Sequence, residues 1–347
     1  FNFSKGIPRY EVRRSYFSYY LARKRYMNIS LVFVFIVSLL ISTVGTKLLI
    51  PFLKQKQFGQ FIREEGPEAH KKKAGTPTMG GVMIVLGIAA GLATGIVTNG
   101  DAADTFAIIL TMLVFGAIGF LDDFEKIAKK NNLGLTAKQK ILLQVLLSLG
   151  IGLYMILGGN GTDVLIPFVN IYVNFGLLFM PFVILTEVAM SNGVNLSDGL
   201  DGLASSVTLV VAILFAVVGY THDVYILTVS GLAIAGSLIG FLFFNKYPAK
   251  IFMGDTGSMA LGGVLSAIAI VSKTEFLLPV AGIIYVVESL SVIIQVVYFR
   301  KTGGKRFFRM APIHHHFELG GMKEYNVVKL FTLVTVCSSV IAYFSVA

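Results

Sequence analysis

Ten long apolar stretches constrain this chain more than any other feature of its sequence. They cover about 30–53, 79–98, 104–121, 139–157, 171–190, 201–220, 224–244, 257–272, 276–299 and 327–345. A helix needs about 20 apolar residues to cross the hydrocarbon core of a bilayer. Only 14% of the residues are charged, against about a quarter in a soluble domain. The sequence therefore excludes a water-soluble globular fold and predicts an all-α, multi-pass membrane protein with ten transmembrane helices.

Basic residues are distributed unevenly over the connections between these stretches. The first, third, seventh and ninth connections hold 6, 5, 2 and 6 Lys or Arg residues, the fifth holds none, and the even-numbered connections hold only Lys273. Since cytoplasmic loops carry an excess of Lys and Arg, we expect the odd connections to face the cytoplasm. In so apolar a chain, the net charge of +10 favours anionic lipid or an anionic substrate over nucleic acid as the partner.

The N-terminal residues conflict with this orientation. Ten spans with cytoplasmic odd connections place both termini outside, yet seven basic residues precede the first span. A segment that lies along the membrane surface would explain them. We therefore expect residues 1–27 to form a basic, aromatic segment and residues 28–347 to form a single ten-helix transmembrane domain.

The unusual polar clusters also lie in the odd connections. They are Lys71–Lys73, Asp122–Asp123, Asn192–Asp201, Asn245–Asp255 and His314–His316. The even connections hold scattered acids and a stretch, 164–173, that could form a small β-hairpin. The sequence therefore predicts that a functional site lies at one membrane face, the cytoplasmic one.

Two adjacent acids, Asp122 and Asp123, close the third apolar stretch. Neighbouring residues on a helix point about 100° apart, so we expect one carboxylate to face a cation and the other to face a proton. The alternative is a helix end that is simply charged, although acids are poorly placed there because the helix dipole favours cations.

The stretch from Asn192 to Asp201 is the densest polar segment of the chain. Ser197 or Asp198 could cap the sixth helix, and Asp198 and Asp201 would share a face at a spacing of three. A plain cap needs only one polar residue, so the remaining amides and acids, among them Asn195, favour a functional role.

Gly254 and Asp255 open the eighth apolar stretch. A glycine beside an acid at a helix start lets a phosphate or a metal approach the backbone. Carboxylates that come from separate loops suit Mg²⁺, which keeps waters and binds substrate phosphates. Lysines in the same connections would neutralise a diphosphate, unless they merely face lipid headgroups. These are Lys73, Lys126, Lys130 and Lys138.

Three consecutive histidines, His314 to His316, lie in the last basic connection. Adjacent residues cannot easily all reach one metal, so hydrogen bonding to phosphate or proton handling fits them better. Within the apolar stretches, Glu288 and Gln295 lie seven residues apart on one face, and Glu187 lies in the fifth stretch. Acids within a membrane are functional candidates, with structural hydrogen bonding as the alternative for Glu187 and Glu288.

Five motifs occur together and in order along residues 45–347. They are His70-x-x-Lys73-x-x-Thr76-Pro-Thr-Met-Gly-Gly81, Asp122-Asp123, Asn192-x-x-Asn195-Leu-x-Asp198-Gly-Leu-Asp201, Asn245-x-x-Pro248-Ala-x-x-Phe252-Met-Gly-Asp255, and Ala311-Pro-x-His314-His-His-x-Glu318. In this combination the chain closely resembles the bacterial phospho-N-acetylmuramoyl-pentapeptide transferases, a family of polyprenyl-phosphate N-acetylhexosamine-1-phosphate transferases.

The resemblance implies a Mg²⁺-dependent enzyme with ten transmembrane helices, usually a homodimer, in the bacterial plasma membrane. Such an enzyme transfers phospho-N-acetylmuramoyl-pentapeptide from UDP-N-acetylmuramoyl-pentapeptide to undecaprenyl phosphate at the cytoplasmic face. The products are lipid I and UMP, in peptidoglycan biosynthesis. Membrane lipid is then a further partner, and nucleic acid is not.

The resemblance also implies roles for individual residues. Asp255 is the expected Mg²⁺ ligand, and Asp122 and Asp123 are expected catalytic acids, one of them the base that deprotonates the acceptor phosphate. Contacts to the nucleotide and sugar are expected from Asn195, Asp198, Asp201, Phe252, Gly254 and Gln295. Phosphate-side residues are expected at Lys73, Lys126, Lys138 and His315, the last also as a catalytic residue, with further substrate contacts at Asn192, Asn245, His314 and His316. An aspartyl-phosphate intermediate stays open, but we favour direct in-line attack because phosphoryl transfer needs mainly positioning and charge neutralisation.

Two other functions compete with this interpretation. A sister enzyme that moves N-acetylglucosamine-1-phosphate would share the aspartates and Mg²⁺, but the Pro-x-His-His-His-x-Glu loop that starts at Pro312 favours the muramoyl-pentapeptide donor. A secondary transporter would use Glu187 or Glu288 as proton carriers. Transporters place polar groups near the midplane and often contain inverted repeats, whereas most polar groups here lie at one surface and no repeat is evident.

Overall fold

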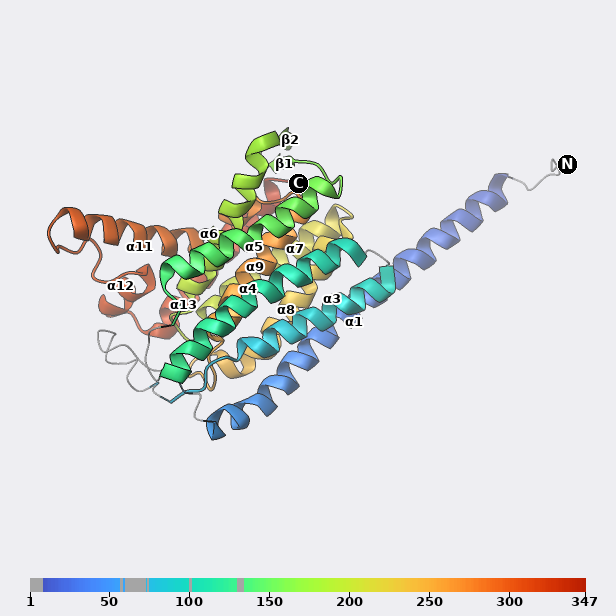
Figure 1. Ribbon diagram of the computed structural model, residues 1–347. Coiled ribbons are helices and arrows are strands. Elements are labelled where there is room, and N and C mark those ends of the chain that lie inside the picture. Colours follow the sequence, from blue (N-terminus) through green and yellow to red (C-terminus); the bar gives the residue numbers. More distant parts are fainter. Residues whose placement is uncertain (1–8, 57–58, 60–72, 74, 100–101, 130–133) are drawn as a thin grey trace.

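The computed structural model describes residues 9–56, 59, 73, 75–99, 102–129 and 134–347. It contains, in chain order, α1 (Arg9–Gln55), α3 (Gly81–Asn99), α4 (Ala102–Lys129), α5 (Ala137–Leu157), β1 (Asp163–Ile166), β2 (Ile171–Asn174), the short 3₁₀ helix η1 (Gly176–Leu178), α6 (Phe179–Ser197), α7 (Leu203–Thr221), α8 (Tyr225–Asn245), α9 (Gly254–Val271), α10 (Leu277–Ala281), α11 (Ile283–Lys301), α12 (Ile313–Leu319) and α13 (Glu324–Phe344) (Figure 1). His70, Lys71, Lys72 and residues 1–8 lie outside the described residues.

The all-α, multi-pass architecture predicted from the sequence is confirmed. Within the described part of the chain, nine helices are long and apolar enough to cross a membrane, and α3 adds a shorter apolar helix over Gly81–Val97. Each of the ten predicted stretches contains one of these helices. The count of ten spans therefore depends on α3 and stays a prediction.

Two of the predicted spans differ in their bounds. The fifth stretch was expected to be helical from residue 171, but residues 171–174 form strand β2 and the helix α6 begins at Phe179. The ninth stretch divides into α10 and α11 at Gly282. The β-hairpin expected over 164–173 is confirmed, with Asp163 opposite Asn174 in an antiparallel pair.

The prediction that Ser197 or Asp198 caps the sixth membrane helix, which is α7 in the structure, is wrong. Asn192 and Asn195 lie in the last turns of α6, and Asp198 follows its C-terminus. Helix α7 starts only after Gly202, whose φ of 76° lies in the left-handed region. A glycine adopts this backbone conformation at little cost, and it reverses the chain between the two helices. The polar segment therefore consists of a helix end and a turn.

Helix α1 continues without a break from Arg9 to Gln55. The same helix therefore includes residues 9–27 and the first membrane span, and the placement of residues 1–27 along the membrane surface stays a prediction. The physical reason is local, because residues 9–28 contain neither Gly nor Pro, the two residues that disfavour a helix most. Figure 1 shows this helix extending well beyond the rest of the bundle.

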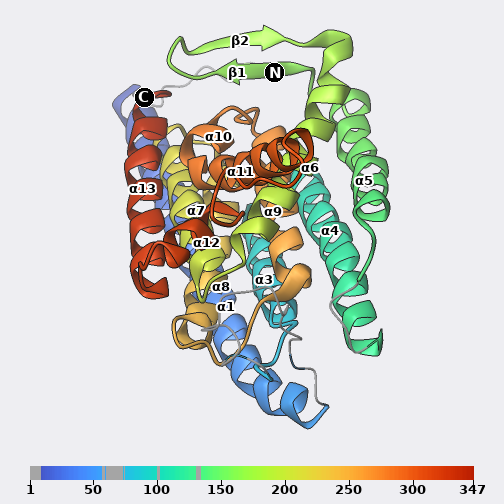
Figure 2. The same cartoon turned by 90° about the vertical axis from the view of Figure 1, so that its left-hand side faces the viewer.

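The buried core is formed by helices α7, α8 and α9. Of the most apolar window of α9, 83% is buried inside the protein, against 22% for α11. Helix α4 packs on α9, α7 packs on α8, and α1 packs on α8 and α3 (Figure 2). The outer helices thus surround a central group and expose their apolar side chains, as lipid-facing helices do.

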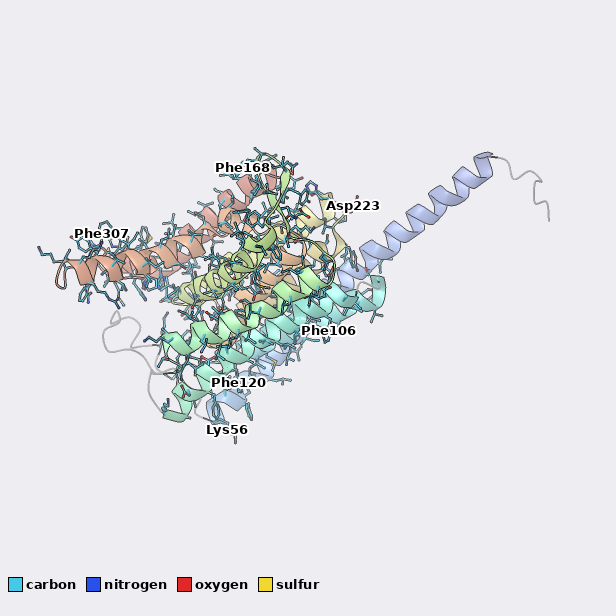
Figure 3. All side chains as sticks on the ribbon, turned by 45° about the horizontal axis from the view of Figure 1, so that its top comes forward. Lys56, Phe106, Phe120, Phe168, Asp223 and Phe307 are labelled. Atoms are coloured by element: carbon cyan, nitrogen blue, oxygen red, sulfur yellow. The ribbon has the colours of Figure 1, made fainter. Side chains whose placement is uncertain are left out.

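The two ends of the bundle carry different structures. The β-hairpin lies at one end, and the C-terminal end of α4 and the start of α3 lie at the other (Figure 2). Lys56 and Asp223, which belong to odd and even connections, lie at opposite ends of the molecule (Figure 3). At the end that carries Lys56, hydrogen bonds and ion pairs join the polar clusters of the odd connections to one another.

Candidate active site

The buried face of α4 leads directly to the two adjacent aspartates. Ile108, Met112, Phe115 and Gly119 are buried at intervals of three or four residues, and Asp122 continues the same stripe. This spacing places them on one face of a helix, and that face packs against α9. Asp122 and Asp123 are therefore carried to the start of α9 by ordinary helix packing.

A glycine permits the close approach of these two helices. A Cβ added at Gly119 would lie 2.1 Å from the backbone oxygen of Asp255, a distance that no side chain could tolerate. Gly254 has a φ of +70°, and a Cβ there would lie 2.6 Å from Oδ2 of Asp123. Both positions therefore require the residue that lacks a side chain.

Asp123 binds the N-terminus of α9. Its Oδ1 accepts the backbone N–H of Asp255 at 3.0 Å. Its Oδ2 accepts the backbone N–H of Thr256 at 2.9 Å and the Thr256 hydroxyl at 2.6 Å. The first N–H groups of a helix lack partners within it, so Asp123 acts as a cap supplied by another helix.

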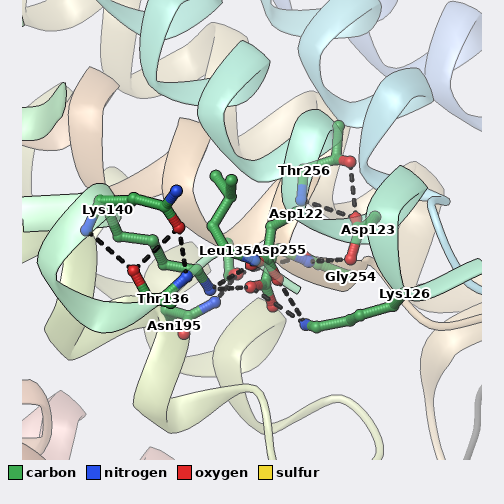
Figure 4. Close-up of polar contacts among 12 residues, drawn as sticks. Asp122, Asp123, Lys126, Leu135, Thr136, Lys140, Asn195, Gly254, Asp255 and Thr256 are labelled. Carbon is green, nitrogen blue, oxygen red and sulfur yellow. Dashed lines mark hydrogen bonds and ion pairs between the residues drawn. The ribbon is translucent and has the colours of Figure 1, made fainter. Parts of the chain in front are cut away.

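Asp122 and Asp255 share two lysines (Figure 4). The Lys126 ammonium lies 2.6 Å from Asp122 and 3.2 Å from Asp255. The Lys140 ammonium lies 3.0 Å from Asp122 and 2.6 Å from Asp255. Asp122 also accepts the backbone N–H of Leu135 at 2.7 Å. Two cations and two anions thus alternate at the end of the bundle.

The three aspartates are close enough together to hold a cation. One carboxylate oxygen from each of Asp122, Asp123 and Asp255 lies within 4.8 Å of the others. Oxygen ligands of this kind suit Mg²⁺, so the residues present fit the expected metal. The adjacent aspartates were expected to face in different directions; they do bind different partners, but their oxygens converge at Asp255.

Lys140 belongs to this cluster although the sequence analysis did not select it. Lys138, which was selected, is exposed and lies two residues earlier on the same helix, hence about 200° around its axis. The Thr136–Gln139 capping box fixes where α5 begins. The capping box can be recognised in the sequence, but the face that α5 turns toward α4 decides which lysine reaches the acids.

A second ionic cluster lies at Lys73. Its ammonium donates to Asp201 at 2.6 Å and to Glu324 at 2.5 Å. Burial lowers the pKa of Lys73, but the hydrogen bonds and charges of these two acids outweigh burial and raise it above its usual value. Glu324 was not selected from the sequence, because it follows the last motif and its partners are distant in the chain.

Asp198 experiences the charges of both clusters. Burial raises the pKa of its carboxyl group well above the usual value, and the negative charges of Asp255, Asp123 and Asp201 raise it further. The acids of three separate motifs therefore act on one position, as a single site requires.

Two models of known protein families match the chain. The model of glycosyl transferase family 4 matches residues 105–273, which include both Asp122 and Asp255. Signature 1 of the phospho-N-acetylmuramoyl-pentapeptide transferases matches residues 73–85 and begins at Lys73.

Three curated relatives carry the name phospho-N-acetylmuramoyl-pentapeptide-transferase. The protein of Listeria monocytogenes serotype 4b is 47% identical over 313 residues, which are 90% of this chain and 97% of the Listeria protein. That of Clostridium beijerinckii is 47% identical over 312 residues, covering 89% of this chain and 94% of its own. That of Clostridium botulinum (strain Alaska E43) is 44% identical over 321 residues, covering 92% and 98%.

This chain belongs to the phospho-N-acetylmuramoyl-pentapeptide transferase family.

The remaining residues selected from the sequence shape the transferase site through contacts between its segments. Asn192 donates to Gln144 of α5 at 2.9 Å, and Asn195 donates to Ser258 of α9 at 2.9 Å. These amides therefore hold the end of α6 against the two helices that carry Lys140 and Asp255.

The α8–α9 loop of the transferase is held by Asn245 and Phe252. Asn245 is buried, accepts the Ser205 hydroxyl at 2.9 Å and donates to the carbonyl of Ile251 at 3.0 Å. The backbone N–H of Phe252 donates to Pro77 at 2.8 Å. In this structure Asn245 therefore orients the loop rather than facing an open surface.

Gln295 and the three histidines organise the last connection. Gln295 accepts the backbone N–H groups of Phe307 and Phe308 at 3.1 and 2.9 Å. The nitrogen Nδ1 of each histidine has a different partner. His314 lies 2.9 Å from Glu288, His315 lies 2.8 Å from Glu318, and His316 accepts the backbone N–H of Arg309 at 3.1 Å.

His314 also packs against the polar turn after α6. A Cβ added at Gly199 would lie 2.2 Å from its Nε2. Helix α12 therefore lies beside Asp198, and the Nδ1 atoms of its three histidines have three different partners.

Proposed function

We propose that the chain transfers phospho-N-acetylmuramoyl-pentapeptide from UDP-N-acetylmuramoyl-pentapeptide to undecaprenyl phosphate and releases UMP. The product is lipid I, an intermediate of peptidoglycan synthesis. One observation carries the proposal. Asp122, Asp123 and Asp255 converge within 4.8 Å beside two lysines at one end of a membrane-spanning bundle. Family membership supports the same reaction, because the relatives carry this enzyme's name.

The proposed step is a direct in-line displacement. An oxygen of undecaprenyl phosphate forms a new bond to the phosphorus that carries the sugar, and the bond from that phosphorus to the UMP oxygen breaks. A phosphate monoester has a second pKa near 6, so most of the acceptor is already dianionic at neutral pH. The step then needs alignment and charge neutralisation more than a covalent intermediate.

The lysines supply the neutralisation. Lys126 and Lys140 contact Asp122 and Asp255 at 2.6–3.2 Å, so their ammonium groups are held at the carboxylates rather than free in solvent. Charge that builds on the leaving phosphate would meet cations that are already oriented, and this pre-orientation is the main source of electrostatic catalysis. Lys73 would bind the other side of the nucleotide-linked diphosphate.

Mg²⁺ is the cofactor that this site fits best. Asp255 and Asp122 would hold the ion. Asp123 lies close to both, but its oxygens already accept hydrogen bonds from the N-terminus of α9. The ion would neutralise oxygens of the donor diphosphate. Asp123 is then chiefly a positioning group, and its carboxylate keeps Asp255 directed toward Asp122.

The membrane arrangement follows from the same chemistry. We propose ten spans in the bacterial plasma membrane, with the acidic cluster facing the cytoplasm, where the water-soluble UDP donor is found. The basic odd connections support this orientation. The acceptor's phosphate would lie at the membrane surface and its tail along the exposed apolar helices. A homodimer is proposed from the family resemblance alone.

The decisive experiment is UMP release by the purified protein in detergent with undecaprenyl phosphate. We expect release with the muramoyl-pentapeptide donor and Mg²⁺, and loss of release when EDTA removes the metal. UDP-N-acetylglucosamine serves as the control donor. Turnover with this control alone would replace the proposed substrate by that of the sister enzymes, and accumulation of a substrate in sealed vesicles without any UMP release would favour a transporter.

A further inference from the structure

Glu324, the first residue of α13, lies where four segments of the site meet. Its Oε1 accepts both the Lys73 ammonium at 2.5 Å and the backbone N–H of Asp201 at 2.7 Å. Lys73 also donates to Oδ1 of Asp201 at 2.6 Å, and Oδ2 of Asp201 accepts the backbone N–H of Ala249 at 2.8 Å. These bonds join α13 to the segment before α3, the α6–α7 turn and the α8–α9 loop.

The three charged side chains of this cluster are shielded from water. Their exposed fractions are 17% for Lys73, 2% for Asp201 and 9% for Glu324. Ion pairs at an exposed surface contribute little, but charges held in a less polar environment interact more strongly. The cluster therefore fixes its members more firmly than a surface ion pair would.

A lysine in particular needs such fixing. Its ammonium has three donors and ends a flexible four-carbon chain, so an unpaired lysine would sample many positions. Here two carboxylates of the described residues take two of the three donors, and the third could donate to another anion. Glu324 thus restricts where Lys73 can place its charge, and it also holds the backbone of Asp201.

We propose that Glu324 is a positioning residue for the nucleotide-sugar donor. It holds Lys73 and the Asp201 turn in the geometry that binds the donor and does not itself touch the transferred phosphate. The inference rests on the proposed function, because it takes Lys73 and Asp201 as donor contacts. Lys73 and Glu324 lie 251 positions apart in the chain, so only the tertiary structure shows that they form a pair.

The variant Glu324→Gln tests this role. It keeps an oxygen that can accept the Asp201 N–H and removes only the charge that faces Lys73. If Glu324 supports binding that is equally strong in the ground state and the transition state, its loss raises KM and leaves kcat unchanged. We therefore expect the KM for the UDP donor to rise about tenfold, with kcat and the KM for undecaprenyl phosphate within about twofold of the wild-type values. Glu324→Asp, which keeps the charge, should restore part of the donor affinity.

A double-mutant cycle distinguishes positioning from general damage. If Glu324 acts through Lys73, Glu324→Gln should have little further effect on the donor KM in a Lys73→Met background. Glu125→Gln is the matched control. It removes an acid from the more exposed ion pair with Lys129, whose side chains are 36% and 52% exposed, and should leave all constants unchanged.

Three results would overturn the inference. They are an unchanged or lower donor KM in Glu324→Gln, a fall in kcat without a change in the donor KM, and additive effects in the double mutant. If Glu324→Gln does not fold in detergent, Glu324→Asp is used instead. Because this variant keeps the charge, its KM for the donor should rise less than tenfold. Failure of the wild-type protein to release UMP would instead reject the proposed function and leave the contacts of Glu324 as a structural feature.

Discussion

Asp123 on α4 accepts the backbone N–H of Asp255 at the first turn of α9, at 3.0 Å. The bond links two acids that lie 132 residues apart in the chain, and it makes one of them the cap of the helix that carries the other. The position of the expected metal ligand Asp255 is therefore set by a neighbouring aspartate as well as by its own helix.

This relationship predicts different effects for two substitutions of Asp123. Asp123→Asn keeps one oxygen acceptor and should reduce the rate of UMP release about tenfold, because charge-assisted bonds are about twice as strong as neutral ones. Asp123→Ala leaves the start of α9 uncapped and should reduce the rate about a hundredfold, since a displacement of about 1 Å can cost that much. Steady-state rates at saturating Mg²⁺ measure the difference. Equal losses in both variants would contradict a capping role.

Replacing Asp255 by Ala should abolish the Mg²⁺-dependent reaction, with a loss of about a hundredfold or more, because a pre-oriented charge is removed from the reacting groups. The protein should still fold, since this residue contributes no apolar packing at the core. The measurement is UMP release over a range of Mg²⁺ concentrations, with thermal unfolding in detergent as the control for folding. Activity close to that of the wild type would remove Asp255 from the site.

Lys140→Met should reduce the rate about a hundredfold, because its ammonium contacts both Asp122 and Asp255 and the loss leaves their charges unbalanced. Lys138→Met should lose less, because the Lys138 side chain is exposed on another face of α5. Lys129→Met, in an exposed ion pair, should retain the wild-type rate. A larger loss in Lys138→Met than in Lys140→Met would mean that α5 faces α4 differently from the structure.

Asp163→Asn tests which end of the bundle carries the chemistry. Asp163 lies in the hairpin at the end opposite the acidic cluster, is 40% exposed and is 3.8 Å from Lys273. Surface substitutions of this kind change stability little, so turnover should stay within about twofold of the wild-type value. A large loss of UMP release would show that the hairpin end takes part in the reaction.

Glu275, between α9 and α10, predicts a dependence of stability on pH. The side chain is buried, and neither carboxylate oxygen has a hydrogen-bond partner among the described residues. Burial raises the pKa of Glu275 to about 8 from its usual 4.5. Between pH 4.5 and pH 8 the folded protein then holds a proton that the unfolded chain releases, so this contribution to stability is lost as the pH rises through that window.

The variant Glu275→Gln cannot release a proton and should flatten this dependence. We expect its Tm in detergent to exceed that of the wild type at pH 8 and to match it near pH 5. Glu125→Gln, a substitution of a more exposed acid, should keep the wild-type slope. The same Tm difference between the wild type and Glu275→Gln at pH 5 and at pH 8 would show that Glu275 does not hold a proton in the folded protein.

Several of these features could be predicted from the sequence. The apolar stretches determine a multi-pass helical membrane protein, because a helix satisfies its own backbone hydrogen bonds in lipid. The hairpin was expected over residues 164–173, and the structure forms it over 163–174. Asp122 and Asp123 were selected because the helix dipole disfavours acids at a helix C-terminus, and Asp255 because it stands between glycines at a helix start, where a phosphate or a metal can approach.

Other features could not be predicted, because they depend on which faces of distant helices meet. The basic connection and the family resemblance suggested Lys138, but the rotation of α5 against α4 brings Lys140 to the acids. Glu324 follows the last motif and becomes part of the site only where α13 packs beside the α6–α7 turn. The helix boundary at Phe179 was missed because the apolar residues Ile171 and Val173 of β2 were read as the start of the stretch that follows.

The sequence by itself determined the membrane class, the family and the acids that carry charge at one end of the bundle, because hydropathy and motif residues are local properties of the chain. The tertiary structure decided which of these acids lie close enough together to hold a cation, which one caps a helix and which lysine each one faces. Those roles depend on distances of a few ångströms between helices, and such distances are set by close packing at positions such as Gly119 and not by any local pattern.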